Sequence, residues 1–300
     1  MARYDIAVVG SGPAGLTAAL YARRAGKSVL ILEKENFGGQ ITFSPKVENY
    51  PTRQAISGAE LSEQMIEQVQ AQGAELEMDE ITSIAKDADG FTLKGAYGQY
   101  QAKAVILATG SKHRTLGLEN EEKLVGAGVC YCAVCDGAFF KGQDVAVVGG
   151  GNTALQDTVL LAEICRSVTV VQNLPYLTGE QALQDKIAAL PNVKIIVNAT
   201  VDKLIGGDAL TGLQITHEGN AETLAVTGVF VAIGQKPEND AFSELAQLDD
   251  YGYLQADERC LTKTEGLFVA GDCRTKAVRQ VVTASADGAV AALAACRYLG

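Results

Sequence analysis

Residues 4–15 read YDIAVVGSGPAG, an apolar run followed by a glycine-rich turn. Residues 4–9, which are apolar apart from Asp5, predict a buried strand, and a helical pattern continues over about 13–25. A second apolar strand is expected at 28–32, and it ends on Glu33. A glycine-rich turn in this strand–turn–helix–strand setting is the fingerprint of a dinucleotide-binding unit.

The residues of this turn have separate tasks in such a unit. Gly10 allows the tight turn, Gly12 allows a pyrophosphate to approach, and Gly15 lets the helix pack on the strand. The Glu33 carboxylate is placed for ribose hydroxyls. The pyrophosphate would lie at the helix N-terminus, where free N–H groups and the helix dipole favour an anion.

The same pattern returns 139 residues further along the chain. A strand at 144–148 leads into a second glycine-rich turn, a helix runs to about 165, and a strand at 167–171 ends on a polar residue. The positions correspond at one offset: Gly10 with Gly149, Gly12 with Gly151, Gly15 with Ala154, and Glu33 with Gln172. The match is therefore an internal repeat, and not two chance motifs.

Two further apolar strands, 104–107 and 228–231, each end in small residues and a polar linker. These linkers, 111–117 and 235–240, are the expected crossings between domains. The sequence thus predicts an α/β protein with two Rossmann-like dinucleotide-binding domains, the second inserted into a discontinuous first. The expected domain ranges are 1–113 and 239–300 for the first, and 114–238 for the second.

Composition narrows the function classes. The chain has 300 residues, is 47% hydrophobic and carries a net charge of -11, which argues against nucleic acid and anionic membranes as partners. The apolar run 6–22 is broken by glycines and has almost no basic residue before it, so it is expected to belong to the fold and not to a signal peptide. Without an export signal, seven cysteines indicate a reducing cytoplasm.

A Cys-x-x-Cys pair, Cys132 and Cys135, is followed directly by Asp136 and lies ahead of the second glycine turn. Two such cysteines can cycle between dithiol and disulfide, and an adjacent carboxylate can move the proton that each half-reaction needs. Asp136 could instead cap a short helix near 138–141. Cys130 leaves two alternatives open: a different disulfide, or a zinc site, which the lack of a second cysteine pair and of a nearby His disfavours.

The whole pattern resembles the low-molecular-weight thioredoxin reductases, a flavoprotein family with two dinucleotide folds. The likeness covers essentially the full chain and depends on these motifs: 10–15, Glu33, Gly38-Gly39-Gln40, Val47-Glu48-Asn49-Tyr50, Ala108-Thr109-Gly110, 132–137, 149–154, 232–237, Gly271-Asp272 and Arg279-Gln280. The resemblance implies FAD in the first domain, a nicotinamide nucleotide in the second, thioredoxin or a thioredoxin-like protein as acceptor, and a homodimer.

Site residues follow from the same resemblance. Cys132 would be the exchanging thiol, Cys135 the flavin-proximal thiol, and Asp136 the proton carrier. The implied FAD site comprises Gly10, Ser11, Gly12, Pro13, Ala14, Gly15, Glu33, Gly39, Gln40, Asn49, Gly271, Asp272, Arg279, Gln280 and Val281. The corresponding pyridine nucleotide site comprises Gly149, Gly151, Asn152, Thr153, Ala154 and Gln172.

One segment departs from the family. NADPH-dependent members carry a His, two arginines and a further Arg after the second strand of the inserted domain, whereas residues 172–178 here read QNLPYLT. Losing two charge-assisted hydrogen bonds costs about 3 to 6 kcal/mol, so efficient use of NADPH is not expected. NADH would meet only a neutral partner in Gln172, and a carrier such as ferredoxin is the competing donor.

Two other functions remain open at this point. A small-molecule dithiol oxidase would run the cysteine pair in reverse, although such enzymes tend to carry His where this chain has Asp136. A non-catalytic flavin redox sensor would leave the Cys-x-x-Cys-Asp arrangement unexplained. Outside the motifs, we expect the acidic run 119–122 to be a solvated face and His113 to be a surface residue.

Overall fold

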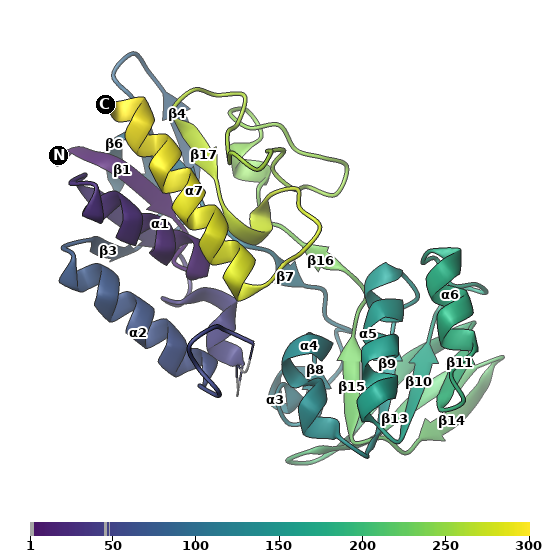
Figure 1. Cartoon of the computed structure of the whole chain (residues 1–300). Coiled ribbons are helices and arrows are strands. Elements are labelled where there is room, and N and C mark those ends of the chain that lie inside the picture. The colour runs from purple at the N-terminus through teal and green to yellow at the C-terminus, as the bar shows by residue number, and fades with distance from the viewer. Residues whose placement is uncertain (1–2, 45–46, 48) are drawn as a thin grey trace. The chain divides into compact units, whose positions relative to one another are not determined.

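The computed structural model describes residues 3–44, 47 and 49–300 (Figure 1). Glu48, which belongs to the motif expected at 47–50, lies outside the described residues. The chain divides into two compact units: unit 1 is Met1–Lys112 with Lys236–Gly300, and unit 2 is His113–Gln235. These boundaries lie one to three residues before the expected ones, where two short strands, β7 (Lys112–His113) and β16 (Gln235–Lys236), pair with each other.

Unit 1 is built on a seven-stranded sheet in the order β3-β2-β1-β6-β5-β4, with β17 beside β6. The strands are β1 (Arg3–Val9), β2 (Val29–Glu33), β3 (Glu75–Met78), β4 (Ile81–Lys86), β5 (Phe91–Gly95), β6 (Gln99–Leu107) and β17 (Leu267–Val269). Neighbouring strands are parallel except at the β4–β5 and β5–β6 pairs. The glycine-rich turn follows β1, which lies between β2 and β6, so the chain leaves β1 where the strand order changes direction. Open α/β sheets bind their ligands at the carboxyl ends of the strands at such a point.

Helices cover this sheet because its central strands are apolar on both sides; all five residues of β2 are buried. The helical elements of unit 1 are α1 (Pro13–Arg24), η1 (Gly39–Phe43), α2 (Gly58–Ala71), η3 (Asp240–Phe242), η4 (Gly271–Cys273) and α7 (Val281–Leu299). Alanines of α1 and α7 pack together in one core cluster on one face, as Figure 1 shows for the two helices. A second cluster with Phe91, Leu93 and Phe242 fills the other face.

Unit 2 repeats the arrangement with a five-stranded parallel sheet in the order β11-β10-β9-β15-β8. Its strands are β8 (Val129–Cys130), β9 (Asp144–Val148), β10 (Ser167–Val171), β11 (Val193–Ile196) and β15 (Gly228–Val231). A separate antiparallel sheet contains β12 (Ala199–Gly206), β13 (Leu210–His217) and β14 (Asn220–Leu224). The helical elements are α3 (Glu121–Leu124), α4 (Ala133–Asp136), η2 (Gly137–Phe140), α5 (Asn152–Ile164) and α6 (Gln181–Ala188).

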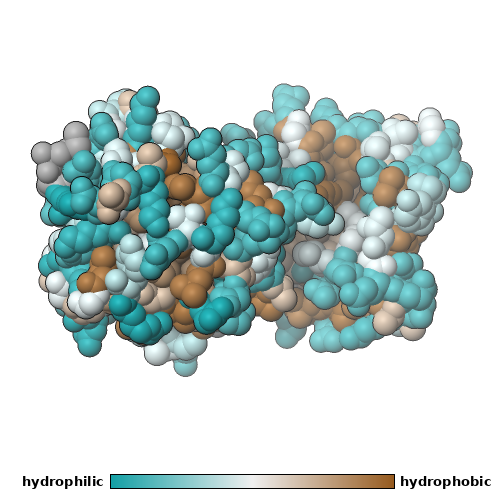
Figure 2. All heavy atoms as spheres, turned by 90° about the horizontal axis from the view of Figure 1, so that it is seen from above, coloured by the Kyte–Doolittle hydropathy of each residue, from teal (hydrophilic) through white to brown (hydrophobic). Residues whose placement is uncertain are grey.

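Both expected strand–turn–helix–strand units are present, and the apolar run 6–22 falls within β1, the glycine turn and α1. None of the described helices is long and apolar enough to cross a membrane. Figure 2 shows hydrophilic side chains over most of the visible surface, with apolar atoms scattered between them.

Candidate active site and nucleotide sites

The first glycine turn has the backbone that its sequence predicts. Gly10 has φ +103°, and a Cβ there would lie 2.3 Å from the carbonyl oxygen of Ala108. A Cβ on Gly15 would lie 1.9 Å from the carbonyl oxygen of Gly10, so both glycines are required for packing. At Gly12 nothing lies within 4 Å of an added Cβ. Gly12 therefore leaves open space at the N-terminus of α1, which no side chain caps.

Ser11 and Glu33 meet beside this turn. The Glu33 carboxylate accepts hydrogen bonds from the Ser11 N–H and the Ser11 hydroxyl, both at 2.8 Å. Its other oxygen accepts from the N–H groups of Lys34 and Glu35. Glu33 is thus held at the end of β2 with a fixed carboxylate, the position expected for a ribose-binding residue.

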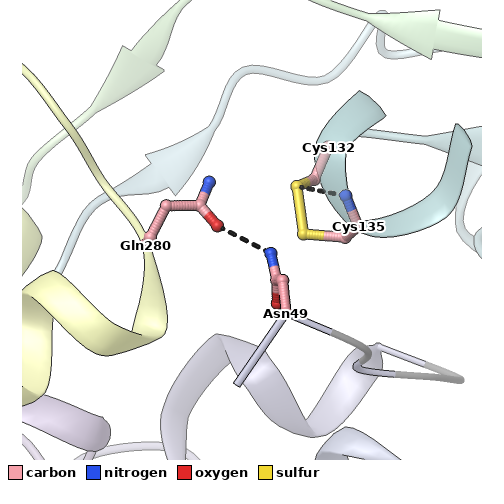
Figure 3. The surroundings of a disulfide bond; sticks show 4 residues. All are labelled: Asn49, Cys132, Cys135 and Gln280. Atoms are coloured by element: carbon pink, nitrogen blue, oxygen red, sulfur yellow. Dashed lines mark hydrogen bonds between the residues drawn. A yellow bond between two sulfur atoms is a disulfide. The ribbon is translucent and has the colours of Figure 1, made fainter. Parts of the chain in front are cut away.

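The other residues expected at the FAD site lie in unit 1 on four segments. Gly39 approaches Gly12 so closely that an added Cβ would be 3.0 Å from the Gly12 Cα. Gln40 donates from Nε2 to the carbonyl oxygen of Ser111 at 2.6 Å. Asn49 donates from Nδ2 to the Gln280 side chain at 3.1 Å, as Figure 3 shows.

The return from β17 completes this set with η4 and the start of α7. Oδ1 of Asp272 is buried and has no hydrogen-bond partner among the described residues, and burial raises the pKa of this carboxyl to about 6. The guanidinium of Arg279 stacks on the Tyr253 ring at 4.1 Å and donates to the carbonyl oxygen of Asp272. Gln280 caps α7, and Val281 is its first residue. A buried carboxylate oxygen without a partner fits a site that binds hydroxyl groups of a ligand.

The second glycine turn reproduces the first. Gly149 has φ +132°, and a Cβ there would lie 2.4 Å from the carbonyl oxygen of Ala232, while nothing approaches Gly151 closer than 3.8 Å. The carbonyl oxygen of Gly150 accepts from the Thr178 N–H at 2.8 Å, just as that of Ser11 accepts from the Gly38 N–H at 3.2 Å. The backbone of the second turn is therefore as open to a dinucleotide as that of the first.

The side chains around the second turn differ from those of the first. Gln172 is buried, lies over Gly150, and donates from Nε2 to the carbonyl oxygen of Tyr176 at 3.2 Å. Asn152, the first residue of α5, is paired through its amide with Glu180, and Thr153 is exposed. Ala154 fills the place of Gly15 and is fully buried. The loop after β10 offers no positive charge to a 2′-phosphate.

Cys132 and Cys135 form a disulfide on α4 in unit 2, shown in Figure 3. Cys132 is the N-cap of α4, and its Sγ accepts from the Cys135 N–H at 3.2 Å. Both cysteines are half-buried, and the intervening Val134 is 55% exposed. Cys130 is a free, buried thiol in β8, so the alternative disulfide with Cys130 is not the one formed.

Asp136 follows this pair and has an unusual environment for a carboxylate. Its Oδ1 is buried without a hydrogen-bond partner among the described residues, and its side chain makes no cap to η2. The helix-capping alternative is therefore wrong. Burial raises the pKa of Asp136 to about 6, although a hydrogen bond with the Cys130 thiol lowers it. A carboxyl with such a pKa can both accept and release protons near neutral pH.

The expected surface role of the acidic run is wrong for one residue. Glu121 is only 4% exposed, and its carboxylate accepts from the N–H groups of 116–118 and from the Tyr131 hydroxyl. His113, also expected at the surface, stacks on the Tyr131 ring, and burial lowers its pKa. This network ties the start of unit 2 to the residue before Cys132.

Sequence reasoning also missed one half-buried carboxyl and one buried ion cluster. Asp157 in α5 has a pKa that burial raises to about 7. Arg274, Lys276 and Asp287 form a buried ion cluster in unit 1. The signal for the second was present, because Asp287 is the one acidic residue in the alanine-rich stretch 281–299.

Comparison with known proteins gives one consistent result. The family model described as pyridine nucleotide-disulphide oxidoreductase matches residues 4–288. A thioredoxin reductase from Listeria monocytogenes is 40% identical over 299 residues, covering 99% of this chain and 94% of the relative. A thioredoxin reductase from Peptoclostridium acidaminophilum is 41% identical over 307 residues, covering 99% of this chain and 97% of the relative. The crystal structure of the Streptococcus pyogenes thioredoxin reductase matches with TM-score 0.93 at 38% identity, covering 99% of this chain and 98% of the other.

Proposed function

Because this chain belongs to the pyridine nucleotide-disulphide oxidoreductase family and, within it, to the low-molecular-weight thioredoxin reductases, we propose that it reduces the disulfide of thioredoxin or a thioredoxin-like protein. It is an FAD-dependent oxidoreductase. The observation that carries the proposal is the half-buried Cys132–Cys135 disulfide directly followed by Asp136, whose Oδ1 is buried and has no hydrogen-bond partner among the described residues. That combination supplies both an electron acceptor and a proton carrier.

The residues of unit 1 fit FAD as the cofactor. Gly12 leaves open space at an uncapped helix N-terminus for the pyrophosphate, and Glu33 is fixed at the end of β2 for the ribose. Asp272 has a buried carboxylate oxygen that no described residue pairs with, which suits a ligand hydroxyl. When bound, FAD supplies the two electrons that reduce the cysteine pair.

The exchange chemistry then belongs to the cysteines. The Cys132 thiolate attacks one sulfur of the acceptor disulfide; a mixed disulfide forms, and the other acceptor sulfur leaves as a thiolate. Cys135 next attacks Cys132, the Cys132–Cys135 disulfide forms again, and the acceptor leaves as a dithiol. In each of the two steps Asp136 takes the proton of the cysteine thiol that attacks and gives one to the thiolate that leaves, a role that suits its pKa of about 6.

The surface beside the disulfide fits a protein acceptor. Val134 is 55% exposed and Phe139 is 38% exposed, so apolar side chains border the cysteines on α4 and η2. Exposed apolar groups next to a reactive disulfide favour docking of another folded protein over a small polar thiol. This observation favours a thioredoxin-like acceptor over the small-molecule dithiol oxidase.

For the electron donor, we propose NADH or a carrier such as ferredoxin, and not NADPH. The open backbone at Gly151 supports a dinucleotide in unit 2. The absence of positive charge over 172–178 leaves a 2′-phosphate without charged partners. Gln172 retains a neutral amide for a free ribose hydroxyl.

We further propose a homodimer and a cytoplasmic location. Exposed apolar side chains on α1 and α7, among them Tyr21, Val282 and Leu293, suit a subunit interface. Five free cysteines suit a reducing compartment. Sedimentation of the purified protein tests the first proposal.

Two experiments test the function. Anaerobic titration of the FAD-loaded protein with NADH, NADPH and reduced ferredoxin, monitored by flavin bleaching, identifies the donor. Rapid bleaching by NADPH would overturn the argument from the missing arginines.

Steady-state reduction of thioredoxin is then measured for Cys132→Ser and Cys135→Ser. The control is Cys296→Ser, which replaces a free cysteine. Both active-site variants are expected to lose reduction, and the control to keep it. Parent-level turnover by Cys135→Ser would refute the dithiol relay, and FAD with cysteines that never exchange would favour a sensor.

A further inference from the structure

Three buried charged side chains of unit 1 take no part in the chemistry described above. Arg274 donates from Nε and Nη2 to the carboxylate of Asp287 at 2.9 Å each, and Lys276 donates from Nζ to the same carboxylate at 2.8 Å. The three side chains are 3%, 6% and 9% exposed for Arg274, Lys276 and Asp287. Arg274 also lies 3.6 Å from the exposed carboxylate of Glu258, so Asp287 is the one buried carboxylate among these partners. Removing charged groups from water has a large desolvation cost, which close pairing offsets only in part. We refer to these residues as the buried ion cluster.

The cluster also holds a turn of the backbone. Oδ2 of Asp287 accepts the N–H of Gly271 at 3.0 Å. Gly271 has φ +79°, and an added Cβ would lie 2.7 Å from the Cβ of Ala14. At Gly288, directly after Asp287, an added Cβ would lie 2.2 Å from the carbonyl oxygen of Ala14. Asp287 therefore fixes the 271–272 turn against the start of α1, where the first glycine turn ends.

The residue that this turn presents is Asp272. Its Oδ1 is buried without a partner among the described residues, and such an oxygen destabilises the fold unless a ligand satisfies it. Burial raises the pKa of Asp272 to about 6, while the positive charges of Lys276 and Arg279 lower it and the charge of Asp287 raises it. Within the cluster, Asp287 thus holds the turn that carries Asp272, and Lys276 is the member whose charge favours ionised Asp272.

We propose that the buried ion cluster shapes the FAD site through two of its members: Asp287 holds the turn that presents Asp272, and the positive charge of Lys276 favours the ionised form of Asp272. An ionised, fixed carboxylate accepts hydrogen bonds from cofactor hydroxyls that a protonated or displaced one would not. The inference depends on the proposed binding of FAD to unit 1. Its tests are therefore binding measurements on the protein itself, separate from turnover.

The first test removes the central charge. Apoprotein of Asp287→Asn is titrated with FAD, and binding is followed by flavin fluorescence and by the visible spectrum of the bound flavin. We expect the dissociation constant to rise at least tenfold. The control is Asp144→Asn, which removes the partner of Arg166 in unit 2 and should leave FAD binding unchanged.

The second test separates charge from packing and covers the case in which Asp287→Asn does not fold. Lys276→Met keeps the Arg274–Asp287 pair but removes one positive charge that lowers the pKa of Asp272. FAD affinity of this variant should fall more between pH 8 and pH 6 than that of the parent, by at least threefold, because more Asp272 becomes protonated. The control is Lys103→Met, which removes an ammonium group that pairs with Asp5 at 2.8 Å in the parent.

The outcomes are distinct. A parent protein that binds no FAD overturns the proposed function. If the parent binds FAD and both variants match it at both pH values, the inference is wrong and the proposed function stands. If Lys276→Met weakens FAD binding equally at pH 8 and pH 6, the charge of Lys276 does not act on Asp272. The cluster would then have only a structural role, and the inference would also be wrong.

Discussion

Replacing Asp136 with Asn should make the protein more stable and less active. Burial raises the pKa of Asp136 from 3.8 to about 6. The folded protein then binds more protons than the unfolded chain between these values, so stability is lost as pH rises through this window. The difference corresponds to up to ~3 kcal/mol at pH 8 and roughly half that at pH 5. Asparagine keeps the shape of the side chain and removes this penalty.

The assay is chemical denaturation of parent and variant at pH 5 and pH 8, together with the rate of thioredoxin reduction. We expect the stability gain of Asp136→Asn to be larger at pH 8 than at pH 5. Exchange should slow by ~10²-fold or more near pH 7, the usual contribution of a general acid or base. The matched control is Asp157→Asn in α5, because burial also raises the pKa of Asp157, to about 7. That variant should gain stability at pH 8 and keep the parent rate of reduction.

The reasoning would be refuted by an Asp136→Asn protein that reduces thioredoxin at the parent rate across pH 6 to 8. A variant that loses stability at pH 8 would refute the conclusion that burial destabilises the Asp136 carboxylate. If Asp157→Asn loses as much activity as Asp136→Asn, the loss does not come from a specific proton-transfer role of Asp136, and the reasoning is refuted.

Three further predictions concern the two units. Gly15→Ala should fail to fold or lose several kcal/mol of stability because its Cβ would lie 1.9 Å from a backbone oxygen, whereas Gly12→Ala should fold and bind FAD more weakly; melting temperature and flavin content separate the two. Asn173→Arg with Leu174→Arg should tighten NADPH binding by roughly tenfold to a thousandfold, measured by calorimetry, and no change would mean that the loop is not where a 2′-phosphate lies. Glu121→Gln should lower the free energy of unfolding by ~1 to 3 kcal/mol without changing flavin content, and an unchanged denaturation midpoint would contradict its four hydrogen bonds.

Local sequence patterns sufficed for most of the fold. The strand expected at 228–231 is β15, and the helix expected from about 13 to 25 is α1, because apolar period and glycine spacing are properties of neighbouring residues. The repeat at one offset also predicted the equivalence of Gly149 and Gly10, which have matching backbone geometry. Both were predictable because the pattern of neighbouring residues marks them, although the glycines are also required by close approach to distant residues, Ala108 and Ala232.

The parts that could not be predicted depend on contacts between distant segments. Glu121 is buried because it accepts the N–H groups of 116–118 and the hydroxyl of Tyr131, and an acidic run gives no sign of which member will do so. Asp287 meets Arg274 across 13 residues, and the two approach only after α7 folds back onto the sheet. The raised pKa of Asp136 likewise comes from burial, which a motif does not encode.

The pairing of β7 with β16 has a consequence for how this protein can be divided and recombined. Paired strands lie about 5 Å apart, so the two ends of the inserted segment are neighbours in space. A short peptide could therefore join the ends of the remaining chain, and the excised segment could be transplanted into a related host or exchanged for one with a different donor preference. The electron-donor specificity of such a protein would then be a separable module, open to replacement without rebuilding the part that is proposed to hold the flavin.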